Sequence, residues 1–525
     1  MAKTVMIQGT ASDVGKSFVV TGLLRALKKR GITCAPFKSQ NMSNNSRISS
    51  EGHELGTAQA VQAEAAGAKL TSLMNPILLK PASDNGSQVL VRDVSFGHLK
   101  AGEYQKLKVK LKAEIVAAFN NLAKQYDYVV VEGAGSPAEI NLREEDLVNM
   151  GLAEEIDAPV ILVADIDRGG VFASIYGTYM LLSESEKKRL MGYVINKFRG
   201  DVELLKPGLE QLKDYIPLEC LGVIPYSDIE IDVEDSLSFK NKLNALSQVR
   251  QQESLGVKEY FDIAIVKVGH IANVCDYANF ERFKNISVRY ISCAEDMSNA
   301  QSPDLLILPG TKATVKDMQL LHEHGLADEI KKYISQGGAV FGLCGGLQML
   351  GKSLEDPDGV EGVPLRAEGL GVFPYTTKFI EQKTQCLTSC TLKAQLEGEL
   401  SSFSNQKLSG YEIHNGVSTL EAGRTDFLTA HIKAEPSRQD SLLNYVSGDG
   451  KIFATYLHGI FDDDRAVELI CKQARPDFTL QKRADAEESL EAYKDKQYEK
   501  LAALLEEHLD LDDILARVEA FSKEG

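Results

Sequence analysis

The 525-residue sequence predicts an α/β protein with two doubly wound, mostly parallel-sheet domains followed by a helical C-terminal tail. Three observations predict this class. Short, almost continuously apolar runs alternate with longer amphipathic runs, as in parallel sheets that are covered on both faces. This alternation occurs twice, with a polar stretch between, and the chain ends in a charged helical segment. We therefore predict a first domain at 1–237, a linker at 238–258, a second domain at 259–463 and a helical tail at 464–525.

The first domain contains five short apolar runs of the length and composition expected for buried strands. Amphipathic stretches at Lys16–Lys29 and Lys106–Gln125 are predicted helices between them. The predicted strands are Thr4–Gln8, Cys34–Phe37, Tyr128–Val131, Val160–Ala164 and Gly192–Ile195.

The second domain repeats this pattern with four predicted strands. Between about Phe373 and Ala434 the chain is richer in Thr, Ser and short alternating runs, which favour antiparallel strands. The tail is predicted to be helical over Glu487–Phe521, with its charges on a solvated face. The predicted strands of the second domain are Phe261–Val268, Leu305–Leu308, Ala339–Leu343 and Ile452–Leu457.

Composition excludes several classes of function. Lys and Arg number 58 against 75 Asp and Glu, a formal net charge of −17, which argues against a nucleic-acid-coating protein. The eight cysteines are scattered without a paired CxxC pattern, as expected for reduced thiols. The sequence shows neither a signal peptide nor an apolar run approaching the roughly 20 residues of a membrane span. We expect a cytoplasmic protein without membrane or nucleic-acid partners.

The strand Thr4–Gln8 runs into Gly9-Thr10-Ala11-Ser12-Asp13-Val14-Gly15-Lys16-Ser17, and a helix follows at once. The backbone N–H groups of such a loop wrap phosphate oxygens. Lys16 would reach the terminal phosphates, and Ser17 would hold Mg²⁺. Compared with the usual GxxxxGK[ST] pattern, Gly9 precedes Gly15 by one extra residue, and Thr10 occupies the place of the first Gly. The loop predicts ATP binding and is similar to that of dethiobiotin synthetase.

Three further polar groups follow predicted strands, where ligands bind in such sheets. Lys38 places a cation after the second strand, and Glu132 ends a buried strand as a candidate Mg²⁺ ligand with Ser17. A helix-capping or salt-bridged Glu132 is the alternative. Asn196-Lys197 resembles the pair that contacts the base in related nucleotide-binding enzymes.

Cys344 lies between a predicted strand and a predicted helix, flanked by Gly342, Gly345 and Gly346. At a helix N-terminus the helix dipole and free N–H groups favour a thiolate. The glycines permit a tight turn, and the N–H of Gly345 can serve an oxyanion hole. A lone cysteine is more often a small buried hydrophobe, but this setting predicts a nucleophile.

A nucleophilic cysteine needs a base. His458 follows the strand Ile452–Leu457, where a sheet could present it beside Cys344, and His414 is the second candidate. The turn after Leu305–Leu308 could supply a second oxyanion N–H through Gly310.

These residues resemble class I glutamine amidotransferase domains, which have a flavodoxin-like fold. The resemblance implies that Cys344 attacks the side-chain amide of L-glutamine while His458 moves the proton, releasing ammonia. Many such domains have His-Pro-Glu, whose Glu orients the histidine. Here Ile460 stands in that place, so the resemblance supplies no third residue, and the orienting group stays open.

An ATP domain joined to an ammonia-releasing domain implies an amide ligase. The segment Phe37–Ser46 resembles the FKPQNMxxNS motif of the cobyric acid synthase family, with Ser39 in place of Pro. The segments Glu54–Ala63, Met74–Pro81 and Ala164–Ala173 follow in that family's order. The chain also departs from the family's pattern at Ser136-Pro137, directly after Gly135. The resemblance extends from Lys3 to about Phe461.

Membership of this family would imply ATP- and glutamine-dependent amidation of carboxylates b, d, e and g of adenosylcobyrinic acid a,c-diamide. This corrinoid is large and anionic, so we expect polar side chains and cations at its site. The candidates that contact it are Gln40, Asn41, Asp165, Asp167 and Arg168, and ordinary loop polarity is the alternative. Lys16, Lys38 and the Arg168 loop are the expected cations.

Two other readings remain. A cobyrinic acid a,c-diamide synthase would perform the same chemistry on different carboxylates. A ParA/MinD-like ATPase switch would carry a Lys near the start of the loop, where this chain has Gly9-Thr10, and would have no use for Cys344 and His458.

Overall fold

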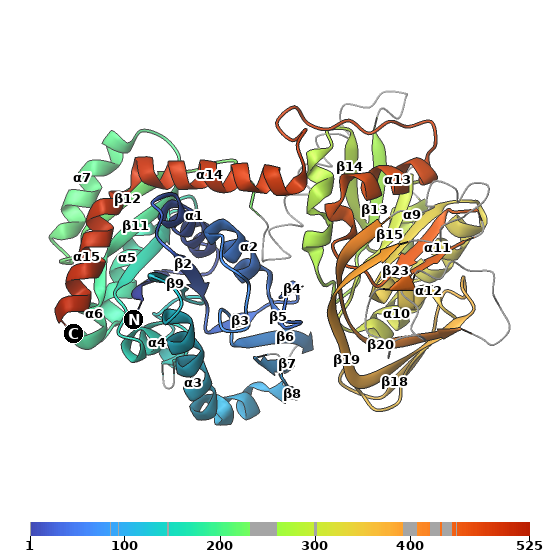
Figure 1. The fold of residues 1–525 in the computed structure, drawn as a ribbon, viewed down its shortest axis with the longest axis horizontal. Coiled ribbons are helices and arrows are strands. Elements are labelled where there is room, and N and C mark those ends of the chain that lie inside the picture. The colour runs from blue at the N-terminus through green and yellow to red at the C-terminus, as the bar shows by residue number, and fades with distance from the viewer. Residues whose placement is uncertain are drawn as a thin grey trace. The chain divides into compact units, whose positions relative to one another are not determined.

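The computed structural model describes residues 2–83, 86–92, 94–143, 146–231, 260–298, 302–391, 407–420, 431–432, 444–447 and 449–524. The chain forms two compact units (Figure 1). Unit 1 comprises Met1–Ser43, His53–Asp232 and Glu491–Gly525, and unit 2 comprises Asn44–Gly52 and Val233–Leu490. The predicted linker at 238–258 lies outside the described residues.

Unit 1 is built on a six-stranded sheet in the order β12-β11-β10-β1-β9-β2, with every neighbouring pair parallel. These strands are β1 (Lys3–Gly9), β2 (Cys34–Phe37), β9 (Tyr128–Glu132), β10 (Val160–Asp165), β11 (Leu190–Phe198) and β12 (Cys220–Pro225). Helices of this unit are α1 (Lys16–Lys29), α2 (Thr57–Ala66), α3 (Ala101–Ala123), α4 (Met150–Glu155), α5 (Val171–Leu181), α6 (Glu184–Lys187), α7 (Val202–Lys213), α14 (Leu490–His508) and α15 (Leu511–Glu524), with the 3₁₀ turn η1 (Ile140–Leu142).

Alternate side chains of the central strands enter different cores. On β1, Met6 packs with α3 and α4, whereas Val5 and Ile7 pack with α1, α14 and α15. On β9, Val131 joins the first cluster and Val130 the second. Because side chains of a strand alternate between the two faces, both faces of this sheet are buried. The predicted doubly wound fold is thereby confirmed for this unit.

A smaller sheet in unit 1 has the order β3-β6-β7-β8. It comprises β3 (Gln40–Met42), β6 (Ile77–Ser83), β7 (Gly86–Val91) and β8 (Val94–Lys100). The short strand β5 (Glu54–Gly56) leads into α2. The strand β3 begins two residues after Lys38 and follows the end of β2 in the main sheet.

Unit 2 has its own six-stranded sheet in the order β14-β13-β15-β16-β23-β22, parallel except for the β22–β23 pair. Its strands are β13 (Phe261–Val266), β14 (Ile286–Ile291), β15 (Leu305–Leu308), β16 (Ala339–Leu343), β22 (Asn444–Val446) and β23 (Ile452–Thr455). Helices and 3₁₀ turns of this unit are η2 (Val274–Arg282), α9 (Ala294–Ser298), α10 (Thr314–Glu323), α11 (Leu326–Ser335), α12 (Gly345–Leu350), η5 (Ile460–Asp462) and α13 (Asp464–Ala474).

A second sheet in unit 2 has the order β18-β17-β19-β20, with β21 paired to β19. These strands are β17 (Ser353–Asp356), β18 (Leu365–Glu368), β19 (Tyr375–Thr391), β20 (Lys407–Leu420) and β21 (His431–Ile432). The long β19–β20 pair is antiparallel, as predicted for this region. The short strand β4 (Ser46–Ile48) also belongs to unit 2.

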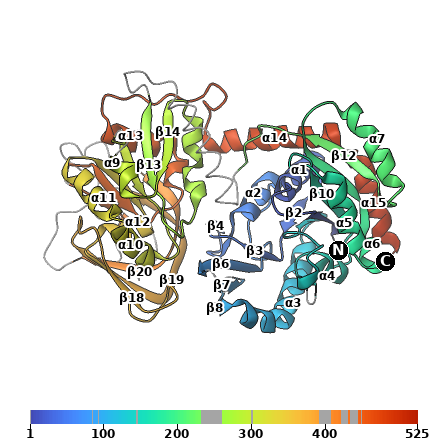
Figure 2. The same ribbon diagram turned by 180° about the vertical axis from the view of Figure 1, so that it is seen from behind.

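The units differ from the predicted domain ranges at residues 44–52, which belong to unit 2, and in the predicted tail. Residues 464–490 of that tail belong to unit 2, and residues 491–525 belong to unit 1. The helices α14 and α15 are therefore packed elements of unit 1. Figures 1 and 2 show α15 beside β12, and Arg517 of α15 pairs with Glu219 at 2.6 Å. A Cβ on Gly22 of α1 would lie 2.5 Å from Leu505 Cδ1, so α14 packs closely on α1.

Among the described residues, no helix combines the length and the apolar character needed to cross a membrane. Seven cysteines whose side chains the structure describes are free thiols.

Candidate functional site

The predicted phosphate loop joins the carboxyl end of β1 to the N-terminus of α1. Gly15 has φ of 97°, and a Cβ there would lie 2.1 Å from Asn196 Nδ2, so both backbone conformation and space require glycine. Lys16 Nζ donates to the carbonyls of Ala11 at 3.0 Å and Gly135 at 3.1 Å. The lysine is thus held over the loop, where it can reach a bound phosphate.

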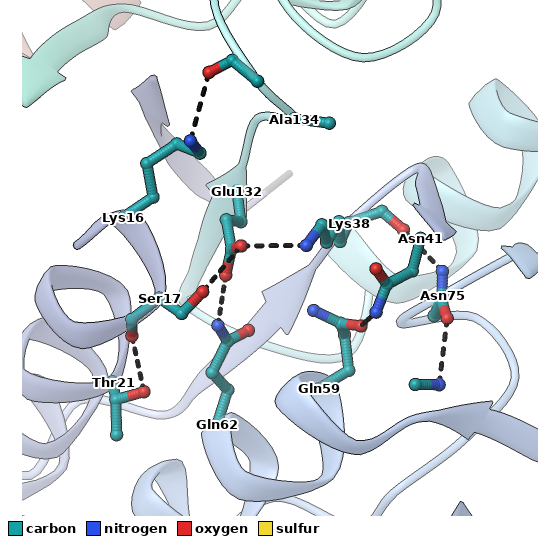
Figure 3. A network of polar contacts seen from close by, with 12 residues as sticks. Lys16, Ser17, Thr21, Lys38, Asn41, Gln59, Gln62, Asn75, Glu132 and Ala134 are labelled. Carbon is teal, nitrogen blue, oxygen red and sulfur yellow. Dashed lines mark hydrogen bonds and ion pairs between the residues drawn. The ribbon is translucent and has the colours of Figure 1, made fainter. Parts of the chain in front are cut away.

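Glu132, at the carboxyl end of β9, contacts three polar side chains, from α1, from α2 and from the end of β2 (Figure 3). Its Oε1 accepts from Ser17 Oγ at 2.9 Å and from Lys38 Nζ at 3.0 Å, and its Oε2 accepts from Gln62 Nε2. These residues meet because β9 pairs in parallel with both β1 and β2. The alternative reading, a salt-bridged Glu132, is therefore observed together with the predicted proximity to Ser17.

Burial of Glu132 would raise its pKa, but the Lys38 ammonium and the hydrogen bonds from Lys38 and Gln62 outweigh it and lower the pKa. The carboxyl is therefore an anion at neutral pH. A buried anion with a neighbouring hydroxyl supplies the oxygen ligands that Mg²⁺ takes alongside substrate phosphates.

Two buried amide oxygens near Glu132 also indicate that a ligand binds there. Gln62 Oε1 and Gln8 Oε1 are buried without a hydrogen-bond partner, and the Gln8 side chain lies beside Gly133, next to Glu132. Unpaired buried oxygens are costly unless a ligand or water satisfies them. In the described part of the chain no three His, Cys, Asp or Glu side chains form a metal cluster, so a Mg²⁺ ion here would depend on Ser17, Glu132 and phosphate oxygens.

Asn196 and Lys197 both contact the phosphate loop. Asn196 Nδ2 donates to the Val14 carbonyl at 2.9 Å, and Lys197 Nζ donates to the Asp13 carbonyl at 2.6 Å. Lys197 also pairs with Asp165 at 2.8 Å. The structure therefore places the pair against the loop, where the amide of Asn196 supports the backbone.

The acidic loop after β10 also lies at the phosphate loop. Arg168 lies 3.6 Å from Asp13 and 3.9 Å from Asp165. Asp167 pairs with Arg199 at 3.2 Å. We expected Asp165, Asp167 and Arg168 at the corrinoid. Arg168 contacts the phosphate loop directly, Asp165 contacts it through Lys197, and Asp167 is paired with Arg199.

The side chains of Gln40 and Asn41 are hydrogen-bonded within unit 1. Asn41 is buried and donates to Gln59 Oε1 at 3.0 Å, as Figure 3 shows, while Tyr104 donates to Gln40 Oε1. A Cβ on Gly56 would lie 2.1 Å from Asn41 Nδ2, so this amide fills a close-packed position. The Asn41 amide is therefore held in place by its packing.

In unit 2, Cys344 occupies the predicted sharp turn between β16 and α12. Its φ of 52° and ψ of −102° are unusual for a non-glycine residue. A Cβ on Gly346 would lie 2.0 Å from the Leu308 carbonyl oxygen, and one on Gly345 would lie 2.7 Å from Thr311 Cγ2. Glycines after Cys344 are therefore needed to seat this turn against β15, as in nucleophile elbows.

His458 meets Cys344 because β23 and β16 are parallel neighbours. The Cys344 side chain is near enough to His458 to help raise the pKa of the imidazole. A Cβ on Gly310 would lie 3.3 Å from His458 Cε1 and 3.8 Å from Cys344 Cβ, so the Gly310 backbone adjoins both side chains. Gly310 and Gly345 are thus close enough to the thiol to serve as oxyanion donors.

The group that orients His458 is Asp276, at the start of η2. Its Oδ2 lies 2.7 Å from His458 Nδ1, and its Oδ1 accepts from the Gly459 N–H at 2.9 Å. Asp276 is fully buried. No sequence pattern points to Asp276, because it lies 182 residues before His458 and a lone Asp carries no local signal.

Burial alone would lower the pKa of His458, but Asp276 and Cys344 outweigh it and raise the pKa to about 10. The imidazole is therefore a cation at neutral pH. A buried imidazolium beside Cys344 stabilises negative charge on the sulfur, which is the state a nucleophilic thiol requires.

His414, the second candidate base, is engaged elsewhere. Its Nδ1 lies 2.7 Å from the Gly416 carbonyl and its Nε2 lies 3.3 Å from Glu412. Its ring stacks on Tyr456 with centroids 3.8 Å apart. Both ring nitrogens are therefore partnered, and the geometry favours His458.

Comparisons with known proteins agree with both units. The model of the CobQ/CobB/MinD/ParA nucleotide binding domain matches residues 5–238, and that of the CobB/CobQ-like glutamine amidotransferase domain matches residues 262–466. "Cobyric acid synthase" of Lachnoclostridium phytofermentans is 45% identical, with 98% of each chain covered. The protein of the same name from Caldanaerobacter subterraneus is 43% identical, with 99% of each chain covered.

The chain belongs to the cobyric acid synthase family. It is accordingly an enzyme of the ligase type that has a glutamine amidotransferase domain, and it uses glutamine and a nucleotide. The predicted family, fold class and enzyme type are confirmed.

Proposed function

We propose that this chain amidates carboxylates b, d, e and g of adenosylcobyrinic acid a,c-diamide, using ATP, Mg²⁺ and ammonia released from glutamine. The observation that carries the proposal is one chain with two reaction centres. It holds a Cys344–His458–Asp276 constellation and a Ser17–Glu132–Lys38 cluster behind a phosphate loop, and it matches cobyric acid synthases over nearly its whole length.

At the glutaminase centre, the Cys344 sulfur attacks the side-chain amide carbon of glutamine. The N–H groups of Gly310 and Gly345 stabilise the oxyanion of the tetrahedral intermediate. His458 gives its proton to the amide nitrogen, the C–N bond breaks and ammonia leaves a thioester on Cys344. Water then attacks the thioester carbon, with His458 accepting its proton; the C–S bond breaks, the Cys344 thiolate is restored and glutamate leaves. Asp276 keeps the histidine in the required orientation.

At the ligase centre, the loop 9–15 binds the phosphates of ATP through backbone N–H groups. Lys16 neutralises the terminal phosphate, and Lys38 adds a second positive charge beside Glu132. A Mg²⁺ ion held by Ser17 and Glu132 would supply charge neutralisation on the phosphates. A corrinoid carboxylate oxygen attacks the γ-phosphorus, ADP leaves, and ammonia displaces phosphate from the acyl phosphate to form the amide.

The test is product analysis with purified protein. The a,c-diamide is incubated with ATP, Mg²⁺ and glutamine, and the products are analysed by mass spectrometry. The expected product has an amino group in place of the carboxyl hydroxyl at four positions. Conversion of cobyrinic acid to the a,c-diamide, with no reaction on the a,c-diamide itself, would indicate the sister synthase instead. ATP turnover without any corrinoid product would indicate a switch ATPase.

The free thiols of the described cysteines fit our expectation that the enzyme acts in the cytoplasm.

A further inference from the structure

Nine residues, Asn44–Gly52, belong to unit 2 although the chain on either side of them belongs to unit 1. They are packed into unit 2: Asn45, Ser46, Ile48 and Ser49 are all buried. A surface connection between two unit 1 segments would not need to bury these polar side chains. The burial therefore indicates that the segment has a role within unit 2.

The first contact of the segment is with the turn that carries Asp276. Asn45 Oδ1 accepts from the Val274 N–H at 3.0 Å, and the Ser46 N–H donates to Asn273 Oδ1 at 2.9 Å. Asn273 is in the left-handed region, with φ of 51° and ψ of 48°, and its carbonyl accepts from the Asp276 N–H at 3.0 Å. A turn in this conformation persists when its surroundings fix it, and the segment supplies two such hydrogen bonds.

The second contact is with the aromatic ring that covers His458. The Arg47 guanidinium lies 5.4 Å from the centroid of the Tyr411 ring and pairs with Asp462 at 3.2 Å. The Tyr411 ring stacks on His458, with centroids 5.3 Å apart and an interplanar angle of 18°. Backbone hydrogen bonds of 3.0 and 2.9 Å also join Tyr411 to His458.

The third contact reaches the thiol. Ile48 packs with Tyr411 and Ile413 in one buried cluster. The Ile413 carbonyl lies 3.6 Å from Cys344 Sγ and accepts its hydrogen bond. The segment therefore contacts residues that themselves touch Asp276, His458 or Cys344.

We propose that Asn44–Gly52 is a positioning element for glutamine hydrolysis, with Asn45 and Arg47 as its positioning residues. Neither residue contacts the reacting atoms: Asn45 acts through the Asp276 turn, and Arg47 acts through Tyr411. Small displacements of reacting groups cost large factors in rate, so loosening either support slows the reaction. The glutaminase centre is thus incomplete without nine residues from the ATP-binding part of the sequence. This inference rests on the proposed function.

The test uses the full-length chain with Asn45→Ala, and Glu51→Ala as the matched control because Glu51 is an exposed side chain of the same segment. Asn45→Ala leaves the Val274 N–H without this acceptor. We expect kcat for glutamate release to fall about tenfold, with KM for glutamine changed less than about twofold. Ligation driven by free ammonia should stay at the wild-type rate in both variants.

A double-mutant cycle separates positioning from general loosening. If Asn45 acts through Asp276, then Asn45→Ala should have little further effect on kcat in an Asp276→Asn background. Fully additive losses would overturn the proposal, as would a parallel fall in ammonia-driven ligation. Should Asn45→Ala fail to fold, Arg47→Leu replaces it, with the same expected loss of glutamate release and the same outcomes that contradict it.

Wild-type activity distinguishes a failure of the proposed function from a failure of the positioning role. A wild-type chain that releases no glutamate from glutamine would overturn the proposed function and this inference together. Active wild-type protein with unchanged Asn45→Ala or Arg47→Leu variants would overturn the positioning role alone.

Discussion

Replacing Asp276 by Asn should disable glutamine hydrolysis while leaving the ligase centre intact. Asp276 accepts one hydrogen bond from Gly459 at 2.9 Å and faces His458 Nδ1 at 2.7 Å. Asn can keep the Gly459 bond through its oxygen, which turns its NH₂ group towards Nδ1. Nδ1 must then be the acceptor, so the ring proton moves to Nε2 and the histidine is in the wrong tautomer.

The magnitude follows from the electrostatics of the site. Asp276 and Cys344 raise the pKa of His458 from 6.5 to about 10 against the opposing effect of burial. At about 1.4 kcal/mol per pKa unit, this net rise favours the imidazolium by on the order of 5 kcal/mol. Loss of the carboxylate removes much of this, and we expect kcat for glutamine hydrolysis to fall about 10³-fold, equivalent to about 4 kcal/mol.

The assay is glutamate release from glutamine across a range of pH, with ammonia-driven ligation measured in parallel. Because the raised pKa keeps His458 charged up to about pH 10, wild-type activity should fall only as pH rises through that value. In Asp276→Asn burial dominates, so the corresponding fall should occur at much lower pH.

Asp262→Asn is the matched control, since Asp262 is another buried carboxylate of unit 2 and pairs with Arg289 at 3.1 Å. It should leave both the rate and the pH profile of glutamate release close to wild type. Asp276→Asn protein that releases glutamate within about threefold of the wild-type rate, with an unchanged pH profile, would show that Asp276 does not orient or charge His458.

Three further substitutions test the other parts of the structure. Cys344→Ala should abolish glutamine-driven ligation and spare ammonia-driven ligation, so loss of both in folded protein would contradict two separable centres. Glu132→Gln should lower the rate of ligation with either glutamine or ammonia by at least about 100-fold and raise the Mg²⁺ concentration that ligation requires. The reason is that it removes a carboxylate that would bind Mg²⁺ and that pairs with the buried Lys38. Glutamate release should persist. The lowered pKa of Glu132 also means that its contribution to stability is present above its ordinary value of 4.5 and is lost as pH falls through the folded value, so Glu132→Gln should flatten the acid limb of a pH–stability curve. Leu505→Ala should lower the free energy of unfolding by about 2–5 kcal/mol in a thermal or urea melt if α14 is a packed element of unit 1, whereas an unchanged melt would indicate a detached tail.

The fold class and the local parts of both centres could be predicted from the amino-acid sequence. Strand–turn–helix order placed Lys16 at the phosphate loop and Cys344 at a sharp turn, because these depend on neighbouring residues and backbone conformation. Parallel strands present their carboxyl ends at one edge, which is why Glu132 could be expected beside Ser17 and His458 beside Cys344.

The distant side chains that complete those centres could be identified only from the three-dimensional structure. Asp276 meets His458 across 182 residues, and Asn45 meets Val274 across 229. The packing of α14 could not be predicted either: its Leu505 packs on Gly22, whereas the sequence indicates only a helix with its charges on a solvated face. Such contacts have no period or spacing in the sequence, since they arise from chain segments that are brought together by burial of apolar faces and by satisfaction of buried polar groups.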